Sequence, residues 1–210
     1  MSEYVYSICI LLILAFLIRM IYLIIVIITG NCTLIRAQTI RTVFCIGSGG
    51  HTTELLRFVK NINMKKYQPR LYILADNDSS SEIKIRETEI DNNYCLTRIP
   101  RSRNVQQSYL SSVVSTLYAT MYSFPVIYNL KPDIIFCNGP GTCIPVCVVA
   151  FILRCLFLID CRIVFIESIC RVRTLSLTGK ILQFFADIMI VQWPNMTETC
   201  FRAKYFGRLT

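Results

Sequence analysis

The sequence predicts an α/β protein: a Rossmann-like parallel sheet covered by helices and joined to one N-terminal transmembrane helix. The chain has 210 residues, enough for one domain with a sizeable core. Its first apolar segment has the length of a membrane span. After that segment, short apolar runs alternate with helical stretches, which is the pattern of a parallel sheet covered on both faces.

The predicted membrane helix is the run from Val5 to Ile28, which at about 1.5 Å per residue crosses roughly 30 Å of hydrocarbon. A signal peptide would have an apolar core of only about 7–15 residues behind basic residues, whereas Glu3 precedes this run. Arg19 is an exception within the run, because a central arginine costs roughly 2.5–3.5 kcal/mol. Snorkelling or a partner helix would offset that cost. A helix lying in the membrane interface is the alternative, but no polar face recurs at helical spacing.

The basic residues Arg36 and Arg41 follow the span, and no Lys or Arg precedes it. The positive-inside rule therefore places the body of the chain in the cytosol. We divide the chain into a short tail (1–4), the transmembrane anchor (5–28), a basic linker (29–41), the sheet domain (42–193) and a C-terminal segment (194–210).

Six apolar runs of strand length are the predicted strands: 42–47, 70–75, 95–99, 133–138, 162–167 and 188–192. Helices are expected at 52–61, 105–128, 142–158 and 176–186. Pro125 and Pro145 predict a kink or an early end in the second and third of these helices. The polar run 76–81 is expected to be a loop that leads into a short charged helix.

The formal net charge of +9 has two interpretations. Basic residues beside an anionic membrane leaflet contribute about 1 kcal/mol each. Basic residues also bind phosphorylated substrates. Nucleic-acid binding is disfavoured, because the chain has a membrane anchor and no helix-turn-helix, RRM or zinc-finger pattern.

Most of the 11 cysteines lie in apolar runs, which predicts buried, reduced thiols in a cytosolic domain. The cysteines in question are Cys45, Cys137, Cys143, Cys147, Cys155 and Cys161. A structural zinc site is disfavoured, because the sequence has one histidine and no C-x-x-C pair.

The most informative motif is the glycine loop 47–54 (GSGGHTTE), which follows the first predicted strand and begins a helix. Glycines at this point let backbone N–H groups approach an anion closely. The spacing matches neither G-x-G-x-x-G nor a Walker loop, so ordinary dinucleotide and P-loop sites are disfavoured. His51 in this loop has the pKa range of a general base for a sugar hydroxyl. The alternative is that its ring caps the loop or binds phosphate.

A second glycine loop, 138–142 (NGPGT), follows the fourth predicted strand, with Thr142 as the expected N-cap of the next helix. Both loops belong to the edge formed by the carboxyl ends of the strands, where such sheets bind ligands. Arg101 and Arg103 follow the third strand at the same edge. A guanidinium group suits phosphate oxygens or a carboxylate, and simple surface solvation is the alternative. Together these features predict an anion site.

Glu167 ends the fifth predicted strand and belongs to the same edge. It is a candidate proton acceptor. The favoured interpretation is instead an ion pair with Arg171 or Arg173.

With these motifs in place, the chain resembles the membrane-anchoring subunits of the two-chain N-acetylglucosaminyltransferase that acts second in dolichol-linked oligosaccharide assembly. The matching segments are 47–54 (GSGGHTTE), 99–109 (IPRSRNVQQSY), 138–145 (NGPGTCIP), Glu167-Ser168, 176–180 (SLTGK), Ala186-Asp187 and 191–194 (VQWP). They span nearly all of the predicted cytosolic part. The fold of this family is related to that of the bacterial enzyme that glycosylates lipid-linked muramyl pentapeptide. Arg19 in the anchor is the departure from the family pattern.

The resemblance implies one half of a GT-B glycosyltransferase. This chain would supply the anchor and the acceptor-side domain, and a soluble partner subunit would supply the domain that binds most of the UDP-N-acetylglucosamine. The implied reaction adds the second N-acetylglucosamine to N-acetylglucosaminyl-diphosphodolichol, with inversion and with no bound metal or other cofactor. It would take place on the cytosolic face of the endoplasmic reticulum membrane. The chain would not be an enzyme on its own.

The resemblance also implies roles for individual residues. The residues expected at the acceptor diphosphate are Ser48, Gly49, Gly50, Arg101, Arg103, Asn138, Gly139, Gly141 and Thr142. His51 and Glu167 are the candidate catalytic residues.

The C-terminal segment is a candidate interface with the partner subunit, because four apolar residues recur there at helix-like spacing. These residues are Phe201, Tyr205, Phe206 and Leu209. Packing against the chain's own sheet is the alternative. Two other functions remain open: a self-sufficient membrane-bound sugar-nucleotide enzyme, which needs a second domain of this kind, and a scaffold that recruits the partner without contributing a catalytic group.

Overall fold

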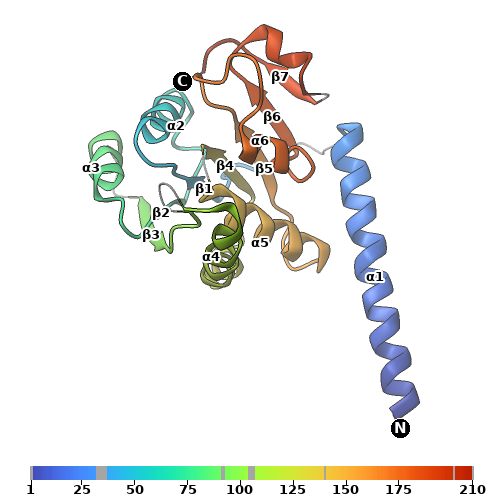
Figure 1. Ribbon diagram of the computed structural model, residues 1–210. Helices are drawn as coiled ribbons and strands as arrows, with labels where there is room; N and C mark the ends of the chain where they lie inside the picture. The colour runs from blue at the N-terminus through green and yellow to red at the C-terminus, as the bar shows by residue number, and fades with distance from the viewer. Residues whose placement is uncertain are drawn as a thin grey trace.

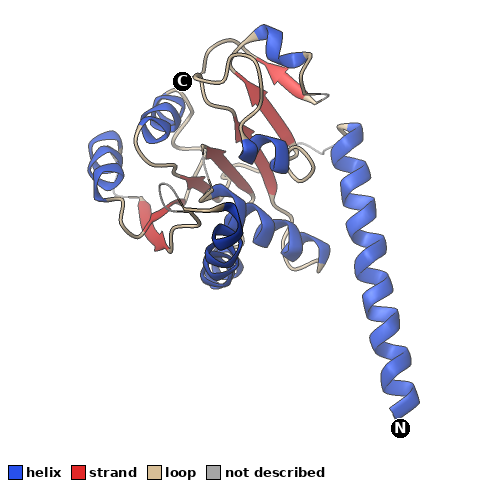
Figure 2. Ribbon diagram, viewed as in Figure 1, coloured by secondary structure: helices blue, strands red, loops and turns tan. Residues whose placement is uncertain are grey.

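A parallel sheet with helices on both faces forms the centre of the fold, and one long helix stands beside it (Figures 1 and 2). The computed structural model describes residues 2–31, 37–90, 93–103, 107–139, 141–200 and 202–209. The seven strands lie in the order β3-β2-β1-β4-β5-β6-β7, and all neighbouring pairs are parallel. The strands are β1 (Thr42–Cys45), β2 (Arg70–Ala75), β3 (Tyr94–Ile99), β4 (Ile134–Asn138), β5 (Arg162–Ile166), β6 (Ile188–Val191) and β7 (Ala203–Tyr205). The helices are α1 (Ser2–Thr29), α2 (Gly50–Lys60), α3 (Ser79–Thr88), α4 (Tyr109–Leu130), α5 (Cys143–Cys155), α6 (Leu177–Leu182) and the short 3₁₀ helix η1 (Pro194–Thr197).

Each face of the sheet has its own core, because successive strand residues point to opposite faces. Val43 and Cys45 of β1 belong to the core that also contains residues of α1, α4, α5 and α6. Phe44 of β1 and Ile46 belong to the second core, with residues of α2 and α3 and with Leu209 near the C-terminus. The helices therefore cover both faces, as the apolar strand runs predicted.

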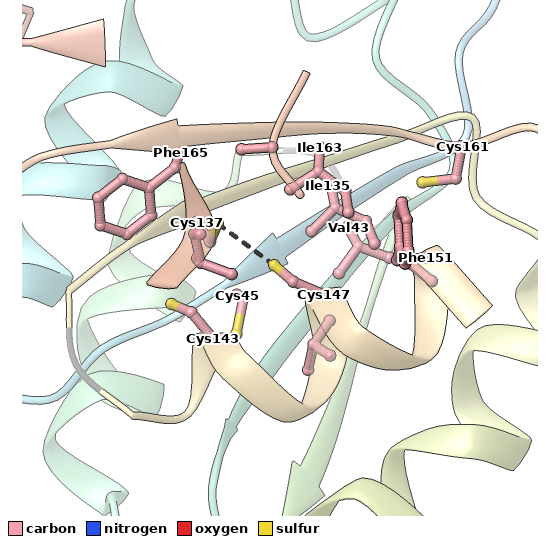
Figure 3. Close-up of a cluster of buried hydrophobic side chains, with 14 of the residues drawn as sticks. Val43, Cys45, Ile135, Cys137, Cys143, Cys147, Phe151, Cys161, Ile163 and Phe165 are labelled. Carbon is pink, nitrogen blue, oxygen red and sulfur yellow. Dashed lines mark hydrogen bonds between the residues drawn. The ribbon is translucent and has the colours of Figure 1, made fainter. Parts of the chain in front are cut away.

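Four cysteines from β1, β4 and α5 meet in the first core (Figure 3). The sulfur of Cys137 lies 3.7 Å from that of Cys147, with Cys45 and Cys143 beside them. The six cysteines predicted to be buried are all buried, and each is a free thiol. Close packing around these small side chains fixes the start of α5 against β1 and β4. That start is one side of the candidate site described below.

The six predicted strands are confirmed, with ends within two residues of the predicted positions. The structure adds β7, which pairs with β6 at the edge of the sheet. Strand β7 has three residues, too few for an apolar pattern to distinguish it from a loop. The C-terminal segment therefore contributes a strand and η1, and its described residues form no α-helix at the helix-like spacing noted above.

The expected early helix ends at the two prolines are wrong. Helix α4 continues through Pro125 to Leu130. The carbonyl that Pro125 leaves without an N–H partner belongs to Met121, which is on an exposed side of the helix. Pro145 is the third residue of α5, where the backbone N–H of any residue would lack a helical acceptor.

Helix α1 packs on the domain only through its C-terminal half, where Leu23 and Ile27 are buried. Its N-terminal half projects away from the sheet (Figure 1). Arg19 lies where the helix and the domain meet, with its guanidinium carbon 4.2 Å from the ring centre of Phe157, just after α5. A cation–π contact within the chain thus partners this arginine. The sequence suggested snorkelling or a second helix instead.

Helix α4 has an unusually apolar exposed surface. By length and composition, it and α1 are the two described helices able to cross a membrane. One stripe of α4, including Ala119, Ser123 and Ile127, is buried in the domain. The exposed side carries Leu110, Val113, Val114, Leu117, Tyr118, Met121, Tyr122, Phe124 and Tyr128. Figure 1 places α4 on the side of the domain toward which the free end of α1 projects.

Candidate functional site

The candidate site lies where β1 and β4 are neighbours. The chain leaves β1 toward β2 on one side and leaves β4 toward β5 on the other, so the connections diverge between these two strands. Their carboxyl ends are level, because Cys45 and Cys137 are register partners. Open α/β sheets bind ligands at such a point. The two glycine loops, which follow β1 and β4, are thereby brought together as the sequence predicted.

The first glycine loop leaves the start of α2 open. Gly49 is the N-cap with φ 67°, a conformation that favours glycine, and it has no side chain to cap the helix. The first N–H groups of a helix have no acceptor within the helix. Gly49 and Gly50 are exposed and Ser48 is half-buried. The loop therefore presents uncapped backbone donors at the edge of the sheet.

His51 belongs to the first glycine loop and contacts the second. Its Nδ1 is 3.0 Å from Oδ1 of Asn138, the last residue of β4. Its ring lies directly over Gly139, because a Cβ at that position would be 2.6 Å from Cγ of His51. Gly139 also has φ +100°, so both its conformation and its contact require glycine. The histidine ring itself is half-buried.

The buried carboxylate of Glu54 is connected to His51 through Asn138. Asn138, which is fully buried, donates from Nδ2 to Oε2 of Glu54 at 3.1 Å. Glu54 also accepts hydrogen bonds from Oγ of Ser168 at 2.9 Å and from the backbone N–H of Ile169 at 3.3 Å. The chain of contacts therefore connects α2, β4 and the loop after β5.

The second glycine loop leads into α5 through Gly141 and Thr142. Thr142 is the N-cap, as expected, but its side chain makes no capping hydrogen bond and its backbone is already helical. A Cβ on Gly141 would lie 3.5 Å from Cβ of Ser102 and 3.9 Å from Cβ of Arg103. The loop after β3 thus lies against the loop after β4. Pro140 is outside the described residues.

The loop after β3 brings polar groups to this junction. Oγ of Ser102 is buried and has no hydrogen-bond partner among the described residues. Arg103 donates from Nε and Nη2 to the carbonyl of Gln107, at 3.1 and 3.0 Å, and so shapes its own loop. Arg101 is half-buried, and its guanidinium makes no hydrogen bond or ion pair within the part of the chain that the structure describes.

Glu167 lies at the same edge but is enclosed. It is 1% exposed, and its carboxylate accepts hydrogen bonds from the N–H of Ser168 at 3.0 Å and from the N–H and Oγ of Ser176 at 2.8 and 3.0 Å. Burial raises its pKa, and these hydrogen bonds oppose that rise. The expected ion pair with Arg171 or Arg173 is wrong: among the described residues, the Glu167 carboxylate accepts hydrogen bonds from Ser168 and Ser176 instead.

Sequence reasoning quoted Glu54 and Ser168 only as parts of motifs and gave no role to Ser102. A signal for Glu54 was available, since a residue three positions after His51 lies on the same side of a helix. The segments that contain Ser168 and Ser102 were expected at this edge, but no local pattern indicates what their side chains contact. Their positions depend on how the loops after β5 and β3 pack.

The C-terminal segment packs beside Trp193 and the loop after β5. Trp193 donates from its ring N–H to the carbonyl of Ile169 at 2.7 Å, and the guanidinium carbon of Arg208 lies 4.3 Å from the Trp193 ring centre. Tyr205 and Phe206 are exposed at the edge strand β7. Leu209 packs into the second core. Phe201 is outside the described residues.

Two solved structures superpose on most of this chain. MurG of Acinetobacter baumannii superposes with a TM-score of 0.55 at 16% identity, over 75% of this chain and 42% of the bacterial chain. UDP-N-acetylglucosamine 2-epimerase of Rickettsia bellii superposes with a TM-score of 0.53 at 11% identity, over 81% of this chain and 45% of the epimerase. This chain thus spans less than half of either enzyme. The comparison confirms the predicted fold, a Rossmann-like sheet equivalent to one half of a GT-B protein.

Sequence comparison gives closer relatives. The protein named UDP-N-acetylglucosamine transferase subunit ALG14 from Rattus norvegicus is 46% identical over 182 residues, covering 82% of this chain and 84% of the relative. The human protein of that name is 47% identical over 173 residues, covering 78% and 80%. The family model described as "Oligosaccharide biosynthesis protein Alg14 like" matches residues 42–209. The chain therefore belongs to the Alg14-like family of oligosaccharide biosynthesis proteins.

Proposed function

We propose that this chain is the membrane-anchored, acceptor-side subunit of a two-chain N-acetylglucosaminyltransferase. The enzyme would transfer N-acetylglucosamine from UDP to N-acetylglucosaminyl-diphosphodolichol. The name of the rat and human relatives, a UDP-N-acetylglucosamine transferase subunit, supports this proposal. The word subunit in that name supports the division of the enzyme between chains.

The observation that carries the proposal is the convergence of two uncapped helix starts on one histidine. Helices α2 and α5 both begin without side-chain caps, and His51, the second residue of α2, contacts Asn138 and Gly139 of the loop that leads into α5. Helix N-termini stabilise phosphate groups through their N–H donors and their dipoles. An acceptor with both a diphosphate and a sugar hydroxyl matches that arrangement.

In this proposal, the backbone of Ser48, Gly49, Gly50, Gly139, Gly141 and Thr142 surrounds the acceptor diphosphate, with Asn138 holding the two loops together. Arg101 reaches the phosphates, because no described residue occupies its guanidinium. The unpaired Oγ of Ser102 is available as a further donor. Arg103 contributes chiefly by holding the loop after β3.

His51 then acts as the general base. It would take the proton of the acceptor hydroxyl while that oxygen attacks the anomeric carbon of the donor sugar from the face opposite UDP, which gives inversion. Glu167 has no open oxygen for this task, since its carboxylate is enclosed by donors from Ser168 and Ser176. We therefore assign Glu167 the role of holding the start of α6.

Membrane attachment follows from α1 and is supported by α4. The apolar run 5–28 of α1 would span the endoplasmic reticulum membrane, with the domain on the cytosolic side. Helix α4 lies on the side of the domain toward which the free end of α1 projects (Figure 1), so its exposed apolar side chains would contact the same membrane. Apolar surface of this extent is costly in water but is favourable at a bilayer. The diphosphate of a lipid-linked acceptor would then reach the site from the bilayer surface.

The partner subunit would bring UDP-N-acetylglucosamine to the edge formed by the carboxyl ends of the strands. Exposed Tyr205 and Phe206 beside the edge strand β7 are candidate contacts for it. An exposed strand edge and aromatic side chains are common features of protein interfaces.

Reconstitution tests this function. Nanodiscs carrying the full chain are mixed with the separately purified donor-binding subunit, UDP-N-acetylglucosamine and an N-acetylglucosaminyl-diphosphopolyisoprenol, and the two-sugar product is measured. We expect product only when both chains are present, and co-elution of the partner with the nanodiscs. Product from this chain alone would indicate a self-sufficient enzyme, and failure of the two chains to associate would refute the proposal.

A further inference from the structure

We propose that Glu54 and Asn138 are positioning residues that hold His51 in one tautomer, with the proton on Nδ1 and a free lone pair on Nε2. This inference rests on the proposed function and extends it, because a general base needs an unprotonated nitrogen that faces its substrate.

The hydrogen bonds of the buried Glu54 carboxylate decide which group donates and which accepts at each contact between Glu54 and His51. An ionised carboxylate only accepts hydrogen bonds. Glu54 is 8% exposed and accepts from Oγ of Ser168, the N–H of Ile169 and Nδ2 of Asn138. The reverse orientation of the Asn138 amide would place its oxygen against this carboxylate, which is repulsive. Glu54 therefore fixes the amide with its NH₂ group inward.

The orientation of the Asn138 amide in turn decides which nitrogen of His51 carries the proton. With its NH₂ group turned to Glu54, Asn138 presents Oδ1 to Nδ1 of His51 at 3.0 Å. A carbonyl oxygen accepts but cannot donate, so Nδ1 must carry the proton for this contact to be a hydrogen bond. Asn138 is fully buried, so water does not compete for the amide. Neutral His51 therefore keeps its lone pair on Nε2.

Nε2 of His51 is the atom of this hydrogen-bond network that stays open for a substrate. Within the described part of the chain, Nε2 of His51 forms no hydrogen bond, and it is not among the buried polar atoms that lack a partner. Nε2 is therefore open to solvent. The ring is held from behind by Gly139. In the reaction, the proton of the acceptor hydroxyl moves to Nε2, the oxygen bonds to the anomeric carbon, and the bonding electrons leave with UDP. The resulting imidazolium is stabilised by Glu54 through Asn138.

A simpler role for Glu54 is that of a strut between α2 and the loop after β5. The two roles predict different results at His51, and the chain is suited to the test because it contains a single histidine. With a purification tag free of histidine, ¹⁵N-histidine labelling of the full chain in nanodiscs gives imidazole signals from this residue alone. The ¹⁵N shifts then report directly which nitrogen carries the proton.

We expect the neutral imidazole of the wild-type chain to show protonated Nδ1 and unprotonated Nε2. Glu54→Gln should produce a mixture of tautomers and, in the two-chain assay, lower kcat by about 10- to 100-fold with little change in the acceptor KM. Glu167→Gln is the matched control: it also neutralises a buried carboxylate at this edge, but among the described residues the carboxylate accepts from Ser168 and Ser176 and makes no hydrogen bond to His51 or Asn138. It should leave the ¹⁵N shifts unchanged.

A wild-type spectrum with protonated Nε2 would overturn the inference without any variant, so the test stands even if Glu54→Gln fails to fold. An unchanged tautomer in folded Glu54→Gln would also overturn it and leave Glu54 as a strut. A shifted tautomer with unchanged kcat would support the positioning of His51 and refute its role as the base. The inference and the proposed function can therefore fail separately.

Discussion

His51 and Glu167 lie at the same edge of the sheet, but the structure gives them opposite surroundings. His51 is half-buried, and only Nδ1 is occupied, by Asn138. Glu167 is 1% exposed, and both of its oxygens accept hydrogen bonds from Ser168 or Ser176. A titratable group can exchange a proton with a substrate only through an atom that the fold leaves open. We therefore infer that one residue is built for chemistry and the other for holding the loops.

A glycine lies beside each of the two residues, and the two glycines differ in what they allow to come close. Gly139 gives His51 room to lie over the backbone and reach Asn138. Gly179 instead lets α6 approach the carboxylate, because a Cβ there would be 2.5 Å from Oε2 of Glu167. Glycine thus lets the His51 ring lie over the backbone in one place and lets a helix enclose the Glu167 carboxylate in the other.

The largest effect is expected from Gly139→Ala, which sharpens the comparison on the His51 side. The new Cβ would meet the histidine ring at 2.6 Å, and the backbone has φ +100°. We expect the ring to be displaced and transfer by the two-chain complex to fall by about 100- to 10,000-fold, the range for loss of a general base. Gly207→Ala is the control, because Gly207 has φ +86° with no atom within 4 Å. Equal losses in both variants would attribute the effect to backbone strain alone.

Arg101→Ala is expected to weaken acceptor binding. Its guanidinium has no partner in the described chain, so its removal breaks no described internal contact. A hydrogen bond to a charged group contributes about 1.5–3 kcal/mol, which corresponds to about a 10- to 100-fold rise in acceptor KM. The measurement is transfer against acceptor concentration at saturating UDP-N-acetylglucosamine. A change confined to the donor KM would assign Arg101 to the donor and not to the acceptor.

Glu167→Gln tests the structural side of the comparison. The amide NH₂ of glutamine would face one of the N–H or O–H donors that the carboxylate now satisfies. We expect the free energy of unfolding to fall by about 1–3 kcal/mol. Urea titration of the full chain in nanodiscs, followed by tryptophan fluorescence, measures this loss. Wild-type stability would show that Ser168 and Ser176 find other partners.

The smallest effect is the pH dependence of that stability difference. Burial raises the pKa of Glu167 in the folded chain. A carboxyl with a raised folded pKa stabilises the fold fully below its unfolded pKa of about 4.3. That contribution disappears as the pH rises through the folded value. The stability advantage of wild type over Glu167→Gln should therefore shrink as the pH is raised from about 4. An advantage that grows with pH would contradict the cited direction of the shift.

The fold could be predicted from the sequence because its signals are local. Each strand from β1 to β6 is an apolar run, and glycine loops follow β1 and β4. The meeting of those two loops follows from the general behaviour of parallel sheets. Strand β7 could not be predicted, because its three residues are ordered by pairing with β6.

The candidate site was predictable only in part. Sequence reasoning placed His51 and Glu167 at one edge but could not rank them, since burial and hydrogen bonding depend on loops distant in the chain. Ser176, which occupies the Glu167 carboxylate, comes from the start of α6. The connection from His51 to Glu54 likewise passes through Asn138 on another strand.

The most direct test of this account compares His51→Ala with Glu167→Gln in the same two-chain transfer assay, with rates divided by the amount of folded, partner-bound complex. The account predicts that His51→Ala lowers kcat by about 100- to 10,000-fold. It predicts that Glu167→Gln retains the wild-type kcat per folded complex. Full activity in His51→Ala would contradict the account and leave this chain as a scaffold for its partner.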